Sequence, residues 1–413
     1  MIQINEKYNC CGCESCVQIC PKGSIKMQRD HEGFFYPRVD DSTCINCHLC
    51  EKVCPILNKR IPIEPLEIWA AQNRDEKVRR ASSSGGVFSL LAEHIINDHG
   101  VVFGAKFNDQ WEVVHDFSEK KEDLIAFRGS KYVQSKILDN FVLARKFLEE
   151  GKKVLFIGTP CQISGLKFYL RKEYVNLFTV DFICHGVPSP GVFRWYLHDQ
   201  ILKLTNRYDT QASIQFSKKI KLSNKIENYG LKNIIIEEIR FRDKREGWKK
   251  YNFFLQFIEK QIDGTKKHIS FSSRVTENLF LKGFCRDLYL RPSCHHCPAR
   301  GFKSGSDITL ADFWGQEYMF PEFDDDSGVS CVMIKTSKGK KIFDALEQVK
   351  KERKTLEQVL SYNPSLIKST PESYYRKKFW KCVGKCSFDE SIVKSINLNI
   401  IEKIVLKIKS VLE

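Results

Sequence analysis

The sequence predicts a multidomain chain that combines the α+β and α/β classes, and three observations lead to this prediction. The chain has 413 residues, more than one hydrophobic core normally serves. Nine of its 17 cysteines lie in the first 60 residues. Farther along, strand-like runs alternate with helical ones, which is typical of an α/β core. We therefore expect a cysteine-rich domain at 1–60, a linker at 61–67, a mixed α/β core at 68–336 and a basic helical region at 337–413.

Composition restricts the compartment and the role of the cysteines. No apolar run approaches the roughly 20 residues of a membrane helix, and residues 1–9 lack the apolar segment of a signal peptide. We expect a cytoplasmic protein without a transmembrane segment. Thiols stay reduced in that compartment, so the 17 cysteines predict metal binding rather than disulfides.

The first domain contains one cysteine pattern twice. The spacing C-x2-C-x2-C-x3-C-P runs from Cys10 to Pro21 and again from Cys44 to Pro55. This is the bacterial ferredoxin pattern for two 4Fe–4S clusters, in which the fourth cysteine of each run binds the other cluster. Two zinc sites are the alternative, although zinc seldom needs eight cysteines with two such endings. The predicted ligands are Cys10, Cys13, Cys16 and Cys54 for cluster one, and Cys44, Cys47, Cys50 and Cys20 for cluster two.

The segments around these runs also carry signals. Cys11 lies outside the pattern, as a bystander thiol or a hydrogen-bonding neighbour. Residues 25–40 alternate and turn at Gly33, as a pair of strands would. The segment KRIPIEPLE at 59–67 has two prolines and predicts the linker.

The middle of the chain predicts an α/β core with an antiparallel insertion. Strand-like runs include VVFGAKF, KVLFIGT, LFTVDFICHG and DITLADFWG, and the insertion at about 205–275 has IIIEEIRFR, FFLQFIE and HISFSS. The serines and glycines at 82–86 precede a helical pattern, so they form either an anion site at a helix N-terminus or an ordinary cap. No G-x-G-x-x-G follows a strand, which argues against a dinucleotide site of the usual Rossmann kind.

Four cysteines of the core are candidates for a third cluster. Cys161 follows the run VLFIGTP, Cys184 follows LFTVDFI, and Cys294 and Cys297 form a C-x2-C pair. Parallel strands of one sheet end on the same side, so these four thiols can meet and hold a 4Fe–4S cluster. The alternatives are that Cys161 and Cys184 are small buried hydrophobic residues, or that zinc binds CHHC through His295 or His296. The other core and tail cysteines are expected to be structural: Cys285, Cys331, Cys382 and Cys386.

At these residues the chain resembles the family of beta subunits of coenzyme F420 hydrogenases and dehydrogenases, which are flavoproteins. The similar pieces are SSSGG at 82–86, GSKYVQS at 129–135, GTPCQ at 158–162, DFICHG at 181–186 and RPSCHHC at 291–297. The resemblance implies that Cys161, Cys184, Cys294 and Cys297 hold a cluster beside a flavin. It also implies FAD on the core, with Ser83, Ser84, Gly85 and Gly86 near its phosphates and Lys131, Tyr132 and Gln134 in the same pocket.

One feature departs from the methanogen members of that family. The long form, with ADFWG at 311–315 and a basic tail, looks like a bacterial branch often associated with surface-polysaccharide genes. The resemblance therefore implies a role in surface-polysaccharide metabolism and leaves open whether a deazaflavin is the substrate.

Together these features predict an iron–sulfur flavoprotein oxidoreductase. Electrons would run from a low-potential donor, such as a ferredoxin, through the clusters and FAD to a small-molecule substrate, because a flavin links one-electron and two-electron chemistry. His185 is a candidate for proton delivery, and Asp312 and Trp314 are candidates for the pocket edge. No catalytic residue is assigned. The alternative is a non-catalytic electron-transfer subunit of a larger redox complex.

The formal net charge of +15 raises a further alternative, an iron–sulfur regulator that binds nucleic acid. The basic residues are spread over several runs, such as RFRDKREGWKK at 240–250, and no nucleic-acid motif is present. We interpret these runs as solvated faces and expect no nucleic-acid partner. The apolar residues at helical spacing in 396–413 favour a helix packed on protein over a membrane-surface anchor.

Overall fold

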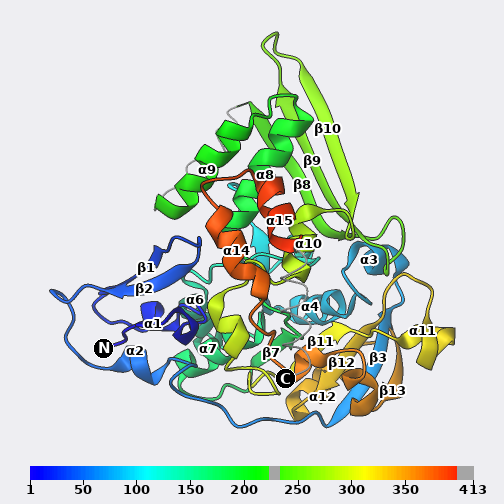
Figure 1. The fold of residues 1–413 in the computed structure, drawn as a ribbon. Helices are drawn as coiled ribbons and strands as arrows, with labels where there is room; N and C mark the ends of the chain where they lie inside the picture. The colour runs from blue at the N-terminus through cyan, green and yellow to red at the C-terminus, as the bar shows by residue number, and fades with distance from the viewer. Residues whose placement is uncertain (223–232, 398–413) are drawn as a thin grey trace, which may run out of the picture.

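Residues 1–222 and 233–397 are described by the structure, a computed structural model (Figure 1). The helix expected at 396–413 lies almost entirely outside these residues. Among the described residues, no helix combines the length and hydropathy of a membrane span.

The N-terminal domain is built around a β-hairpin and two single-turn helices. β1 (Ile25–Arg29) pairs antiparallel with β2 (Phe35–Val39), which confirms the predicted strand pair. α1 (Ser15–Gln18) and α2 (Leu49–Lys52) each contain the third cysteine of one motif. The domain, dark blue in Figure 1, lies at one end of the molecule, where α1 contacts two helices of the core.

An eight-stranded mixed sheet forms the core, in the order β13-β3-β12-β11-β7-β6-β4-β5. The strands β4, β6, β7 and β11 run parallel to one another, and the outer strands pair antiparallel. The predicted mixed α/β core is thereby confirmed. The strands are β3 (Glu67–Asn73), β4 (Val101–Phe107), β5 (Val113–Ser118), β6 (Val154–Ile157), β7 (Leu177–Phe182), β11 (Ile308–Asp312), β12 (Ser330–Ile334) and β13 (Val349–Lys354).

Helices cover both faces of the sheet because successive residues of its strands point to opposite sides. Val102 and Leu155 belong to a buried cluster with residues of α4 and α12. Their neighbours Phe103 and Phe156 belong to another, with residues of α6 and α7. The core therefore has three layers, with the sheet in the middle. These helices are α4 (Val87–Asn97), α6 (Asn140–Glu149), α7 (Pro160–Leu170) and α12 (Ser337–Asp344).

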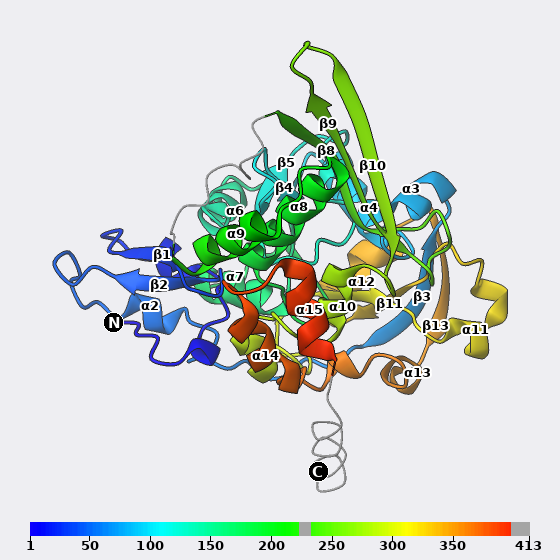
Figure 2. The same ribbon diagram turned by 45° about the horizontal axis from the view of Figure 1, so that its top comes forward.

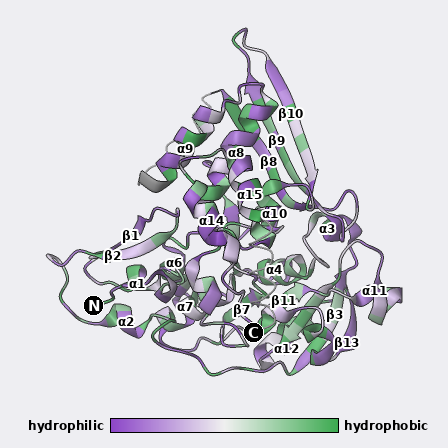
Figure 3. Cartoon of the chain, in the orientation of Figure 1, coloured by the Kyte–Doolittle hydropathy of each residue, from purple (hydrophilic) through white to green (hydrophobic). Residues whose placement is uncertain are grey.

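The antiparallel insertion is present and forms a separate three-stranded sheet. β8 (Ile234–Asp243), β9 (Asn252–Lys260) and β10 (Lys266–Arg274) lie in the order β10-β9-β8 and project from the body of the molecule (Figure 2). β10 has no buried residue, and Figure 3 shows it mostly pale or purple. The buried aromatic residues of β8 and β9 pack against α8 (Pro190–Leu204) and α10 (Leu279–Cys285).

The region after residue 336 differs from the helical tail that the sequence predicts. β13 (Val349–Lys354) is a strand that pairs with β3 at the edge of the core sheet. Its sequence VKKERK is highly charged because edge strands face solvent, and it therefore lacks the apolar pattern by which strands are recognised. The helices α14 (Tyr374–Cys382) and α15 (Phe388–Ile396) do form, and they pack into the hydrophobic cluster of the insertion. The region is therefore part of the core rather than a separate unit.

Candidate redox centre

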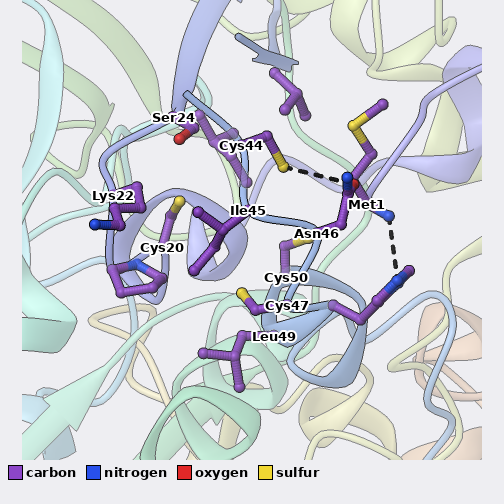
Figure 4. Close-up of a pocket in the computed structure, with 14 residues that line it drawn as sticks. Met1, Cys20, Lys22, Ser24, Cys44, Ile45, Asn46, Cys47, Leu49 and Cys50 are labelled. Atoms are coloured by element: carbon purple, nitrogen blue, oxygen red, sulfur yellow. Dashed lines mark hydrogen bonds between the residues drawn. The ribbon is translucent and has the colours of Figure 1, made fainter. Parts of the chain in front are cut away.

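Two pockets of the N-terminal domain are lined by the cysteines of the repeated motif. One is lined by Cys10, Cys13 and Cys16 together with Cys54. The other is lined by Cys44, Cys47 and Cys50 together with Cys20 (Figure 4). In each pocket the fourth cysteine comes from the other run. The structure thus brings together the two sets that the spacing predicts.

The loops that hold these thiols are tight. Glu14 and His48, the residues before α1 and α2, have left-handed backbone conformations with φ 63° and 58°. They turn the chain so that the third cysteine of each run stands in the first helical turn. The backbone N–H of Ile2 donates to Cys50 Sγ at 3.3 Å, a contact that favours a thiolate at that position.

The two pockets differ in their access to solvent. Cys10, Cys13 and Cys16 are buried, whereas Cys47 is exposed. Ile45, which lines the second pocket between Cys44 and Cys47, is 56% exposed. A protein partner can therefore approach the second pocket and not the first.

The four core cysteines of the predicted third set also lie together. Cys161 is in the first turn of α7, directly after β6, and Cys184 follows β7. Burial raises the pKa of Cys184, and the neighbouring thiols Cys294, Cys161 and Cys297 raise it further. The backbone N–H of Val187 donates to Cys294 Sγ at 3.4 Å. The ends of two parallel strands and one C-x2-C segment therefore form a single group of thiols.

The positions of these thiols can be compared with the needs of a single metal ion and with those of a 4Fe–4S cluster. No group of three or more His, Cys, Asp and Glu side chains in residues 1–222 and 233–397 is placed to hold a single metal ion. A 4Fe–4S cluster spreads its four thiolates over different iron atoms, so it does not need them around one point. The two histidines of CHHC have different surroundings, and His295 Nε2 is buried without a hydrogen-bond partner among the described residues. His295 Nδ1 bonds to the carbonyl oxygen of Thr370 at 2.9 Å, and His296 packs edge-on against Tyr8.

Cys11, outside the motif, connects the first pocket with the third set. Its thiol neighbours those of Cys13 and Cys161, and their proximity together with burial raises its own pKa. The neighbouring Cys11 in turn lowers the pKa of Cys161 to about 7. Cys11 therefore lies beside both groups of thiols, and the choice between the two roles expected for it stays a prediction.

A cavity of about 530 Å³ opens at the carboxyl ends of β6, β7 and β11. Cys184 and His185 form part of its wall, so the cavity borders the third set. His185 Nε2 lies 2.6 Å from Asp287 Oδ1. Asp312 and Trp314, expected at the pocket edge, line it as well.

Five of the seven residues implied for FAD line this cavity: Ser83, Ser84, Gly86, Lys131 and Tyr132. Gly85 does not, because its α-carbon lies against the sheet: an added Cβ would stand 2.3 Å from the carbonyl oxygen of Ala71. Gln134 does not either. Its Nε2 donates to the carbonyl oxygen of Cys11 at 3.2 Å, so it faces the N-terminal domain. Gly85 and Gln134 thus lie outside the cavity wall, whereas the resemblance implies that both contact the flavin.

Several cavity residues were not foreseen from the sequence. Arg242 and Tyr251 come from the antiparallel insertion, and Arg242 belongs to a basic run interpreted as a solvated face. Its side chain is only 4% exposed. His115 of β5 donates from Nε2 to the carbonyl oxygen of Ile157 at 3.0 Å, and burial lowers its pKa to about 4. No local signal in the sequence marks these residues, because distant elements bring them to the cavity.

The remaining cysteines lie away from the three groups. Cys331 is buried in β12, and Cys285 is exposed at the end of α10. Cys382 and Cys386 contact each other, and Lys394 Nζ donates to Cys386 Sγ at 3.5 Å. The structural role expected of these four cysteines stays a prediction.

Comparison with family profiles gives three matches. Residues 9–57 match a 4Fe–4S dicluster domain. Residues 68–140 match the N-terminal part, and residues 151–358 the C-terminal part, of the coenzyme F420 hydrogenase/dehydrogenase beta subunit. The three matches together extend from the first cysteine pocket to β13.

Individual relatives are distant. One component of the F420H2 dehydrogenase of Methanosarcina mazei is 24% identical over 176 residues, which cover 40% of this chain and 49% of that protein. The coenzyme F420-dependent sulfite reductase of Methanocaldococcus jannaschii is 26% identical over 232 residues, covering 54% of this chain and 35% of that protein. The chain thus spans about half or less of the length of these relatives.

One solved structure also aligns with the chain. It is that of the F420-reducing [NiFe] hydrogenase complex from Methanosarcina barkeri. The alignment has a TM-score of 0.40 and 16% identity, and it covers 83% of this chain and 92% of that chain.

Proposed function

The chain belongs to the family of coenzyme F420 hydrogenase/dehydrogenase beta subunits and carries a 4Fe–4S dicluster domain, and on that premise we propose that it is an iron–sulfur flavoprotein oxidoreductase. It would take electrons from a low-potential donor and deliver them through FAD to a small-molecule substrate. One observation carries the proposal: in the group of Cys161, Cys184, Cys294 and Cys297, Cys161 neighbours Cys11 of the first cysteine pocket and Cys184 lines the cavity.

The residues fit a third 4Fe–4S cluster. Four cysteines are the usual ligand set. Cys161 and Cys184 come directly after strands of the sheet, and Cys294 and Cys297 come from the short 3-10 helix Pro292–His296 and the residue after it. Arg291, three residues before Cys294, is fully buried and donates to the carbonyl oxygens of Cys10 and Phe35. It therefore ties the C-x2-C segment to the N-terminal domain and limits the separation of the thiol groups.

The cavity fits a flavin dinucleotide. α4 begins at its wall with Gly86 at φ 80° as N-cap, so the first backbone N–H groups of a helix are available to a phosphate. Arg128, which also lines the cavity, donates from Nε to Ser89 Oγ at 3.1 Å in the same helical turn. When bound, FAD supplies the exchange between one-electron and two-electron chemistry. The residues of the cavity wall would hold it beside Cys184.

The partners follow from the same proposal. The donor would be a ferredoxin or a similar redox protein, since the second cysteine pocket reaches the surface. Coenzyme F420 is the first substrate to test because it stands in the names of the relatives. A cytoplasmic location and a role in surface-polysaccharide metabolism rest on the sequence and its resemblance alone.

The experiment is the iron, sulfide and flavin content of protein purified without oxygen. We expect about 12 iron and about one FAD per chain. Cys161→Ser should lower the iron to about eight per chain, whereas Cys285→Ser, at an exposed cysteine outside the three groups, should not. About eight iron and no flavin in the unaltered protein would contradict the proposal.

A non-catalytic electron-transfer subunit is the second candidate. It is favoured by the match to a protein that is itself one component of a dehydrogenase and of which the chain spans half. An enzyme would release the electrons of its reduced flavin to a small molecule. A relay subunit would release them only to its partner protein.

A further inference from the structure

The cavity wall contains a buried arginine with an unused hydrogen-bonding edge. Arg242 lies near the end of β8, in the insertion, and lines the cavity. Nη1 forms an ion pair with Asp312 Oδ2 at 2.5 Å. Nε and Nη2 are buried and have no hydrogen-bond partner among the residues that the structure describes. A buried N–H group without a partner costs free energy. The edge of the guanidinium formed by Nε and Nη2 is therefore a candidate for binding a ligand.

The free edge has a specific chemistry. Nε–H and one N–H of Nη2 point the same way in a guanidinium group, and together they match the two oxygens of a phosphate or a carboxylate. Asp312 binds Nη1, on the other side of the guanidinium, and therefore fixes the direction of this pair of donors, called the fork below. The side chain thus presents two parallel donors in a fixed orientation.

Aromatic rings hold the guanidinium in place. Its central carbon lies 4.7 Å from the ring centre of Tyr251 and 5.5 Å from that of Trp314. Trp314 stacks on Trp248 with ring centres 4.6 Å apart, and Trp248 Nε1 donates to the carbonyl oxygen of Ser83 at 3.0 Å. The arginine is thereby fixed relative to the serine loop before α4.

Two other basic residues of the cavity, Lys131 and Arg128, already use donor groups on the protein itself. Lys131 Nζ donates to the carbonyl oxygens of Phe127, Arg128 and Gly129 at 3.2–3.4 Å. Arg128 Nε donates to Ser89 Oγ. Arg242 is therefore the cavity residue whose geometry points most directly to an anionic ligand.

We propose that the Nε–Nη2 edge of Arg242 is an anion-recognition group of this cavity and takes a phosphate or carboxylate of the molecule bound there. The inference rests on the proposed function, and it adds the class of ligand. Two sources carry this chemistry: the pyrophosphate of the flavin nucleotide, and an acidic group of the substrate.

The test compares Arg242→Lys with the unaltered protein. Lysine keeps the positive charge but has no fork. The control is Arg240→Lys, two residues earlier on the same strand, where the side chain is 43% exposed and pairs with Glu238. Dissociation constants are measured for FAD and for riboflavin, which has no phosphate. Binding of inorganic pyrophosphate and malonate is followed by tryptophan fluorescence, because Trp248 and Trp314 lie beside Arg242.

Two outcomes support the proposal and name the source. If Arg242→Lys weakens FAD binding about tenfold or more and leaves riboflavin unchanged, the fork binds the flavin phosphate. If FAD binding is unchanged but the FAD-loaded variant loses the binding of pyrophosphate or malonate that the unaltered protein shows, the fork binds the substrate. Equal affinities for all four probes in both proteins would overturn it.

Two further measurements distinguish a failure of the inference from a folding defect and from a failure of the proposed function. If the lysine variant does not fold, the test uses flavin-free unaltered protein. Pyrophosphate or malonate should then quench its tryptophan fluorescence in a saturable way at millimolar concentration. The absence of quenching would overturn the inference. If the unaltered protein binds no flavin, the FAD part of the proposed function fails. The two anions then still test Arg242 itself.

Discussion

Arg291 donates from Nε to the carbonyl oxygen of Cys10 at 2.8 Å, and its Nη2 lies 3.5 Å from Cys10 Sγ. Nη1 donates to Gln134 Oε1 at 2.9 Å, and the guanidinium lies over the ring of Tyr36. One fully buried cation therefore joins the N-terminal domain to the segment that carries Cys294 and Cys297. Its charge lies beside a predicted ligand of cluster one.

The first prediction follows from that charge. Arg291→Met should lower the reduction potential of cluster one, on the order of 50 mV, because a nearby cation favours the more negative reduced form. It should also cost about 3 kcal/mol of stability, since the carbonyl oxygens of Cys10 and Phe35 lose a charged donor. Potentiometry followed by electron paramagnetic resonance measures the first effect, and thermal unfolding measures the second.

The control for this prediction is Arg274→Met, at an exposed arginine of β10. It removes the same charge far from the cysteine pockets and should leave both quantities unchanged. An unchanged potential and an unchanged unfolding temperature in Arg291→Met would show that the arginine does not act on cluster one.

The second prediction concerns the close approach of α7 to the first cysteine loop. An added Cβ at Gly165 would lie 2.6 Å from Ser15 Oγ and 2.9 Å from Cys13 Cβ. Gly165→Ala should therefore push the loop away, destabilise the protein by about 1–3 kcal/mol and lower its iron content. Iron per chain and thermal unfolding are the measurements.

Gly151→Ala is the matched control for Gly165→Ala. Its methyl group would meet nothing within 4 Å, although its φ of 82° strains an alanine. It should lose some stability and keep all its iron. If both variants keep their iron, the contact between α7 and the loop does not hold the first pocket in shape.

The third prediction is a pH dependence of stability. Burial lowers the pKa of Lys131 from 10.5 to about 7. Between these two values the unfolded chain binds one proton more than the folded chain, so stability rises with pH, by at most about 1.4 kcal/mol per pH unit. Below pH 7 both states hold the proton, and the slope from this lysine vanishes.

Denaturant unfolding between pH 7 and 9.5 checks this sign. Lys131→Met should reduce the slope of the unfolding free energy against pH by the contribution of one proton, compared with the unaltered protein. Burial also lowers the pKa of Lys244 to about 7, so Lys244→Met should remove a second such contribution. Equal slopes in the unaltered protein and in both variants would mean that neither lysine loses its proton on folding in this pH range.

The clusters of thiols were predictable from the sequence because ligand spacing is a local property. Cys10, Cys13 and Cys16 must share one loop, and the crossing of Cys54 follows from the repeat. Cys161 and Cys184 were placed by a rule that is almost as local, since each follows a parallel strand.

The cavity was predictable only in part, because its other half comes from packing over long distances. In the sequence Arg242 belongs to a basic run that predicts a solvated surface, and only the fold of the insertion brings its side chain to Asp312. Gln134 stands in the same short segment as Lys131, yet its side chain leaves the segment on the other side and meets Cys11 instead. β13 escaped recognition because its charged side chains suit an edge strand and a helix equally well.

The last prediction concerns the entry of electrons. Ile45 lines the second cysteine pocket and is 56% exposed, and Lys22 lines the same pocket. An apolar side chain beside a basic one at an exposed pocket suits an acidic redox protein as donor. Ile45→Glu should slow reduction by a reduced ferredoxin about tenfold, and leave reduction by dithionite unchanged, because the small reductant needs no docking surface.

Ile262→Glu, at a fully exposed isoleucine in the turn between β9 and β10, is the control and should change neither rate. Stopped-flow absorbance of the clusters gives both rates. If Ile45→Glu slows both reductants equally, it has damaged the cluster site itself, and if it slows neither, electrons enter elsewhere.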